Sequence, residues 1–220
     1  MRYDRIIKIF FYRRFLQKTA GFTSEKVLKS IVIKTAVKTL IAAVVALLIA
    51  FGIASVGFPR SMSGICENTG NYWLAARYAS LSFIYTGDID DLWRGAENGR
   101  RAGDNAKVIE FNEKMTKHSN FGKLCAEKGG EPVRQYVYAN LAQAKYSESD
   151  KQGAVNAVKD ALDGVDGFPK NNALAVLAVT VSKAGDKATA DMLYELMKDR
   201  DDGSEYFSAV ERVLKGTGGN

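Results

Sequence analysis

The chain has 220 residues, 46% of them hydrophobic and 25% charged, which fits one globular domain with an attached segment. Its formal net charge is +6, but residues 1–38 carry ten basic and two acidic residues, which leaves residues 39–220 at −2. A nucleic-acid-binding protein needs a basic face on its folded part, so this distribution argues against nucleic acid as a partner.

Residues 1–38 form a basic segment that we expect to lie in the cytoplasm. Its first half, MRYDRIIKIFFYRRFLQKTA, mixes basic with apolar side chains. Each basic group near an anionic leaflet contributes about 1 kcal/mol of attraction. The segment therefore either lies on the inner membrane surface or only sets the orientation of the next segment, because both uses need the same residues. Membrane lipids are the first expected partner.

Residues 39–59 are 21 consecutive residues without a charge, TLIAAVVALLIAFGIASVGFP. A helix of this length spans about 30 Å, the thickness of a bilayer's hydrocarbon core, which predicts one transmembrane helix. Lys34 and Lys38 lie on one face just before the span, where their ammonium groups reach the headgroups. Arg60 is the one basic residue just after the span. This charge asymmetry predicts a cytoplasmic N-terminus and an extracytoplasmic C-terminal domain in the cell membrane.

A cleaved signal peptide is the alternative interpretation of the same run. Ser55 and Gly57 are small enough to occupy positions −3 and −1 of a cleavage site. The basic region before the apolar run is much longer than that of a signal peptide, however, and the apolar run also exceeds the usual 7–15 residues. An uncleaved signal-anchor is therefore the favoured prediction.

After the span we expect a linker over residues 60–70, a folded domain over residues 71–215 and a flexible tail over residues 216–220. Apolar residues recur at helical spacing along the whole domain. The predicted helices are Tyr72–Tyr85, Asp88–Ala102, Asn105–His118, Phe121–Glu127, Pro132–Ala144, Asp150–Leu162, Asn172–Ala184, Asp186–Lys198 and Ser204–Lys215. No run alternates with period two, so the predicted fold class is all-α. The segment Asn172–Ala184 is apolar all round and too short to span a membrane, which predicts a central buried helix.

The joints between these helices share one pattern. Gly87-Asp88, Gly103-Asp104 and Gly185-Asp186 each place glycine where a left-handed C-cap is wanted and aspartate where the next helix needs an N-cap. Ser149-Asp150 occupies the same position without the glycine. Such tight joints make neighbouring helices pack antiparallel, so a series of them builds stacked hairpins.

Residues 134–200 contain two copies of one pattern of large and small side chains, 36 residues apart. These are Tyr138, Ala142, Ala154 and Ala161, followed by Leu174, Ala178, Ala190 and Met197. With this pattern the segment resembles a tetratricopeptide-like helical repeat. The period of the family is 34, and Lys145 stands where it has a tyrosine. The resemblance implies an α-solenoid of antiparallel hairpins with small residues where the helices approach closely, and a surface that binds a protein or peptide.

Two cysteines, Cys66 and Cys125, follow the span. An even number of cysteines in an oxidising exterior predicts a disulfide, which closes a loop of about 60 residues and stabilises by roughly 4 kcal/mol before strain is counted. A redox or metal pair is the alternative, but a metal site needs three or four ligands and the one histidine, His118, is distant in the sequence. Two free thiols are the remaining possibility.

Further motifs have ordinary structural explanations. The acids of Asp88-Ile89-Asp90-Asp91 suit the first turn of a helix, and the run lacks the glycine and glutamate of a calcium loop. His118 is expected to be a solvated residue at a helix end. Gly95, Gly99 and Gly103 recur every four residues, which either permits close packing or weakens the helix.

The sequence predicts a membrane-anchored, non-enzymatic interaction module that binds a protein or peptide partner through its helical hairpins and needs no cofactor. One alternative is an accessory subunit of a membrane complex, held mainly through its anchor. Another is a cell-envelope enzyme using carboxylates such as Glu97 and Asp91, although no catalytic motif accompanies them. The chain has no Asn-x-Ser/Thr sequon, which favours a bacterial exterior.

Overall fold

The computed structural model describes residues 25–217, with side chains from residue 29 onward. Within this part 81% of the residues are helical and none is in a strand, which confirms the all-α prediction. Most of the basic segment 1–38 and the last residues of the predicted tail lie outside the described residues. Two compact units, Met1–Ala54 and Ser55–Asn220, are described separately below.

The first described helix, α2, covers Glu25–Gly57. Its residues Lys29–Gly57 are apolar and long enough to cross a membrane by length and composition. The helix begins well before residue 39, because the segment that contains Lys34 and Lys38 is also helical. Its large apolar side chains are exposed along the whole length.

The predicted linker over residues 60–70 is wrong, because Pro59–Asn68 forms helix α3. Pro59 occupies the first turn, where a proline costs no hydrogen bond. Pro59, Met62 and Cys66 lie on one face of α3 and are buried. This i, i+3, i+7 spacing was present in the sequence, but the serines and glycines between these residues made the segment look like a loop.

The predicted helices of the domain are all present, with ends that differ by a few residues at most. They are α4 (Tyr72–Thr86), α5 (Ile89–Ala102), α6 (Asn105–Thr116), α7 (Phe121–Lys128), α8 (Glu131–Ser147), α9 (Lys151–Leu162), α10 (Ala173–Lys183), α11 (Lys187–Met197) and α12 (Glu205–Lys215). A short 3-10 turn, η1 (Lys198–Arg200), follows α11.

The predicted joints have the expected geometry. Gly87, Gly103 and Gly185 have positive φ angles of 64°, 69° and 66°. The aspartate after each glycine accepts a hydrogen bond from a backbone N–H in the first turn of the next helix. Ser149 adopts a left-handed φ of 67° in the same position, and Asp150 caps α9.

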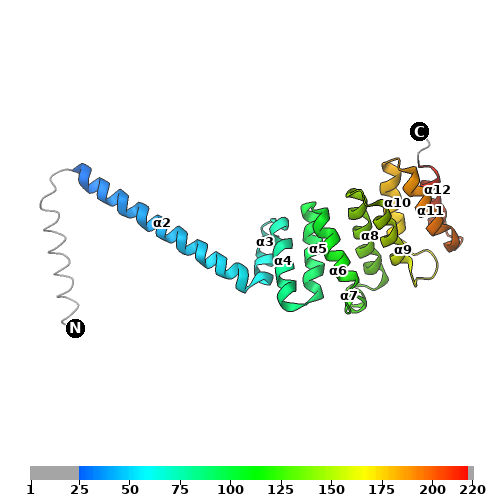
Figure 1. Ribbon diagram of the computed structural model, residues 1–220, viewed down its shortest axis with the longest axis horizontal. Coiled ribbons are helices and arrows are strands. Elements are labelled where there is room, and N and C mark those ends of the chain that lie inside the picture. Colours follow the sequence, from blue (N-terminus) through cyan, green and yellow to red (C-terminus); the bar gives the residue numbers. More distant parts are fainter. Residues whose placement is uncertain (1–24, 218–220) are drawn as a thin grey trace. The chain divides into compact units, whose positions relative to one another are not determined.

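Most consecutive helices of the second unit pack against one another in chain order, whereas α6 packs on α8 and the short α7 packs on α5 and α8 (Figure 1). Buried side chains from α4 to α8 form one core cluster, and those from α8 to α12 form a second. Tyr138 of α8 packs against both clusters. In the second cluster α8 contacts α10, α10 contacts α12, and α9 contacts α11, so alternate helices also touch.

Candidate functional site

The small residues predicted at the hairpin contacts lie together in the second core cluster. Seven of the eight positions are fully buried, with no exposed area: Ala142, Ala154, Ala161, Leu174, Ala178, Ala190 and Met197. Tyr138 is half-buried at the edge, where its ring meets Phe121 edge-on at 6.1 Å. The cluster therefore fixes the relative positions of α8 to α12, which carry the groove described next.

Two glutamines of α8 hold α10 in place at its two ends. Gln135 is 1% exposed, and its Oε1 accepts a hydrogen bond from the backbone N–H of Ala173 at 3.0 Å. Its Nε2 donates to the carbonyl of Ala161 at 2.8 Å, so one side chain joins α8, α9 and α10. Near the other end, Gln143 donates to the Thr180 hydroxyl at 3.2 Å.

An apolar groove of about 350 Å³ runs between α10 and α12. We name it the C-terminal groove. Its lining residues are Asn171, Ala175, Val176, Val179, Tyr206, Ala209, Val210 and Val213. Val179 is 46% exposed, so the prediction that Asn172–Ala184 is buried all round is wrong on this face.

One end of the C-terminal groove is closed by Tyr206. Its hydroxyl accepts a hydrogen bond from the backbone N–H of Asn171 at 2.8 Å. The ring of Phe168 packs on Tyr206 at 5.7 Å, and burial raises the pKa of the tyrosine. Asn171 has a positive φ of 55°, which turns the chain from this contact into α10. Tyr206 is therefore a fixed wall of the groove.

The C-terminal turns of α10 and α12 carry two exposed cations, Lys183 and Arg212. Neither has an acidic partner among the described residues. The lining of the C-terminal groove includes no carboxylate, histidine or cysteine.

The C-terminal groove was not predicted from the sequence. The signal was present in α12, where apolar residues occupy two faces. Phe207, Val210 and Leu214 are buried in the core. Tyr206, Ala209 and Val213 form a second apolar face of α12, which lines the groove.

Apart from the C-terminal groove, a polar cluster lies where α3, α4 and α5 meet. The carboxylate of Asp91 is 1% exposed, and it accepts hydrogen bonds from Ser82 at 2.7 Å and Thr86 at 2.9 Å. Arg60 pairs with Asp91 at 3.4 Å and with Asp88 at 3.0 Å. The basic residue predicted at the membrane interface is thus an ion-pair partner within the domain.

The two carboxylates of the enzyme alternative have separate partners. Asp91 is buried under Ser82 and Thr86, as described above. Glu97 accepts hydrogen bonds from the hydroxyl of Tyr136 at 2.7 Å and from Arg100 at 3.1 Å. His118 accepts a hydrogen bond from the backbone N–H of Asn120 at 3.1 Å, as a residue at a helix end does. Among the described residues no group of histidine, cysteine and acidic side chains is arranged to hold a metal ion.

The disulfide predicted between Cys66 and Cys125 is not formed in the structure, where both are free and buried. Cys66 belongs to α3, which packs on α4, whereas Cys125 belongs to α7, which packs on α5 and α8. An even number of cysteines does not show which helices carry them or how those helices pack. Burial raises the pKa of both thiols.

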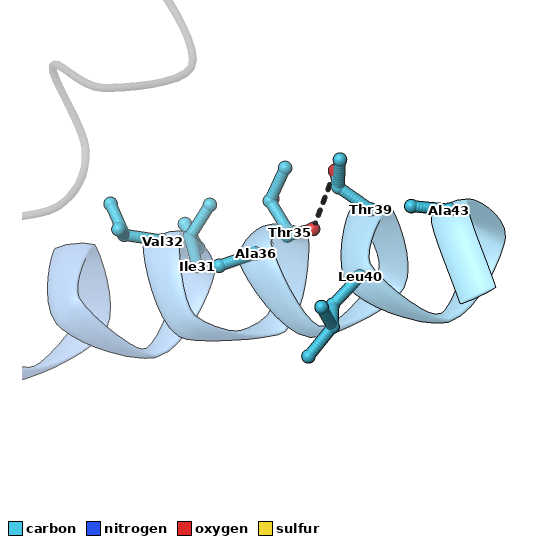
Figure 2. Close-up of a pocket in the computed structure, with 7 residues that line it drawn as sticks. All are labelled: Ile31, Val32, Thr35, Ala36, Thr39, Leu40 and Ala43. Atoms are coloured by element: carbon cyan, nitrogen blue, oxygen red, sulfur yellow. Dashed lines mark hydrogen bonds between the residues drawn. The ribbon is translucent and has the colours of Figure 1, made fainter. Parts of the chain in front are cut away.

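Figure 2 shows a shallow hollow on α2 that is lined by residues of this helix alone. The lining residues are Ile31, Val32, Thr35, Ala36, Thr39, Leu40 and Ala43. The Thr39 hydroxyl donates to the carbonyl of Thr35 at 3.0 Å, so this polar group is satisfied within the helix. Lys34 and Lys38 are exposed. The residues that line the hollow therefore present a mainly apolar surface, which suits an apolar environment.

Comparison of the chain with known protein families, with curated proteins and with solved structures found no match.

Proposed function

We propose that α2 anchors the protein in the cell membrane, with the basic N-terminal segment in the cytoplasm and residues 58–220 outside. The support is a mainly apolar helical segment of 29 residues, Lys29–Gly57, whose large apolar side chains are exposed in the part of the chain that the structure describes. A helix of this length exceeds the roughly 20 residues that a bilayer requires. The excess of basic residues before it favours this orientation.

The outer unit is a stack of helical hairpins of the tetratricopeptide-like type in this proposal. The buried small residues support it, because Ala142 with Ala154 and Ala178 with Ala190 allow two pairs of helices to approach closely. The contacts of α8 with α10 and of α9 with α11 support it as well, because alternate helices touch in such stacks. The 36-residue spacing then relates α8 and α9 to α10 and α11.

The function of this stack is to bind a partner protein or peptide rather than to catalyse a reaction. The observation that carries the proposal is the C-terminal groove, where an apolar surface containing Val179 stays exposed beside a well-packed core. A segment that inserts apolar side chains and carries an acidic residue toward Lys183 and Arg212 matches its chemistry.

Site-specific photo-crosslinking in intact cells tests this proposal. A photoreactive amino acid at Val179 should give one discrete adduct with a partner. The control position is Lys159, which is exposed on α9 and does not line the groove. Equal adducts from both positions, or none from Val179, would contradict a partner in the groove.

A second candidate is an accessory subunit that contacts its complex through the anchor. The hollow on α2 favours it, because the small side chains of Thr35, Ala36, Thr39 and Ala43 let another membrane helix approach closely. Crosslinking from Ala36 separates the two candidates. A protein adduct from Ala36 and none from Val179 would favour the subunit role.

A further inference from the structure

Exposed apolar side chains of the outer unit are most frequent in its first hairpin, which consists of α3, α4 and the residue before α3. Outside α2, the described residues include few large hydrophobic side chains that are exposed. Five of them belong to residues 58–85, and they are Phe58, Ile65, Trp73, Ile84 and Tyr85. A monomeric soluble domain rarely exposes such a group together, which makes these residues a candidate docking surface.

The exposed face of α4 is apolar with one cation. Trp73, Arg77 and Ile84 are spaced by four and seven residues, which places them on one side of the helix. Trp73 is 48% exposed and Ile84 is 71% exposed. The guanidinium of Arg77 lies 3.8 Å from the centre of the Trp73 ring. Arg77 is the only charged residue of α4, and it has no acidic partner among the described residues.

Ser55, near the end of α2, contacts α4 within the second compact unit. Ser55 lies in the last turns of α2 and belongs to the same compact unit as α4. Its hydroxyl is 2.7 Å from the hydroxyl of Tyr78, with which it shares a hydrogen bond. If the apolar helix ends at the outer surface of a bilayer, Tyr78 lies at the depth of the lipid headgroups. Because Ser55 and α4 belong to one compact unit, α4 then lies close to the point where the chain leaves the bilayer.

We propose that the Trp73–Arg77–Ile84 face of α4 docks on the outer lipid surface beside the anchor. Tryptophan prefers this interface because its ring is apolar and its N–H can hydrogen-bond. Arg77 supplies a cation for lipid phosphate, and no carboxylate of α4 opposes it. The position of α4 in the chain, close after the membrane-spanning helix, favours lipid over a protein as the molecule that covers this face. The inference rests on the anchoring role proposed for α2, and it adds that the hairpin unit is held against the membrane.

Tryptophan fluorescence tests this docking, because the chain has two tryptophans. The full chain carrying Trp93→Phe leaves Trp73 as the only reporter. It is reconstituted in vesicles of phosphatidylethanolamine and phosphatidylglycerol, with and without lipids brominated near the headgroup. We expect the bromines to quench Trp73. The matched variant Trp73→Phe reports Trp93, which packs on Tyr136 at 6.0 Å, and its emission should stay unchanged.

The addition of Ile84→Asp to the Trp73 reporter should reduce the quenching, because a carboxylate on the docked face opposes insertion. Quenching that is unaffected by this change, or equal quenching of Trp73 and Trp93, would overturn the proposal. Flotation and alkaline extraction of the same vesicles test the anchor separately. Unquenched Trp73 in a chain that remains with the vesicles would refute the docking alone. Loss of the chain from the vesicles would refute the anchor and the docking together.

Discussion

Gln135 shows how one side chain can join three helices. It is buried among apolar residues, yet each hydrogen-bonding atom of its amide group has a partner, in the backbone of α9 and α10 or in Glu131. The first N–H groups of a helix have no partner within the helix. In α10 the side chain of Gln135 accepts the hydrogen bond from the first of them, the N–H of Ala173. Sequence patterns do not identify such a residue, because a glutamine within a helix usually faces solvent.

Replacement of Gln135 by leucine should destabilise the outer unit by about 1–3 kcal/mol, since the buried N–H of Ala173 would lose its acceptor. Gln143→Leu is the matched control on the same helix. Gln143 is half-buried, so its replacement should change stability by no more than about 0.5 kcal/mol. Urea unfolding of residues 55–220 measures both. Equal effects would mean that the Gln135 network contributes nothing of its own.

The ionisation of Asp186 makes the free energy of unfolding depend on pH. The hydrogen bond from Lys151, at 2.7 Å, is the main cause that lowers the pKa of this carboxyl from 3.8 to about 2, with help from Thr189 and Tyr146. The unfolded chain therefore takes up the proton first as pH falls. The stabilisation is fully present above about pH 4 and is lost as pH falls toward 2.

The variant Asp186→Asn keeps the oxygen that caps α11 but has no proton to exchange. Its unfolding free energy should depend less steeply on pH between 4 and 2 than that of the unchanged chain. Urea unfolding at several pH values in this window measures the two slopes. Parallel slopes would show that Asp186 is not held ionised by its partners.

At the scale of elements, the sequence was most informative about the helix ends, which depend on backbone conformation and on the hydrogen bonds of the terminal N–H groups. The glycine and aspartate joints predicted the helix ends because only glycine adopts a left-handed φ at low cost and an aspartate satisfies the free N–H groups. Helix α3 was missed because Ser61, Ser63 and Gly64 are poor indicators of a helix. Its stability comes from burial of Met62 and Cys66 against other helices, which local propensity does not report.

The contact between α8 and α9 is tight at Ala154, which has no exposed area. The variant Ala154→Leu should destabilise the unit by about 1–3 kcal/mol, because the larger side chain overpacks this contact. The control is Lys159→Leu on the same helix, where the side chain is exposed and a change of no more than about 0.5 kcal/mol is expected. If both variants unfold at the wild-type urea midpoint, the small-residue contact is not tight.

Glycine has opposite roles in α5 and α3. A Cβ atom at Gly95 would lie 2.5 Å from ring carbons of Phe111, so the glycine lets α5 approach α6. A Cβ atom at Gly64 meets nothing within 4 Å. Gly95→Ala should therefore destabilise the unit by about 1–3 kcal/mol, whereas Gly64→Ala should stabilise it by roughly 0.5–1 kcal/mol. Circular dichroism during thermal unfolding measures the two shifts, and shifts of the same sign would contradict the packing at Gly95.

At the scale of the molecule, the outer unit consists of two core clusters that share α8. The helical pattern predicted that the chain folds into helices, but not which surfaces remain uncovered. The C-terminal groove needs α10 and α12 to lie side by side, and they are separated by α11 in the chain. The predicted disulfide is likewise not formed in the structure, where Cys66 and Cys125 belong to helices with different neighbours.

The central claim is that α2 separates a cytoplasmic segment from an outer hairpin unit. Labelling with a membrane-impermeant thiol reagent in intact cells tests it most directly. Cys66 and Cys125 are buried, so the unchanged chain provides the blank. We expect Lys159→Cys to be labelled in intact cells and Lys18→Cys to be labelled only after lysis. Equal labelling of the two variants in intact cells, or labelling of Lys18→Cys alone, would contradict the account.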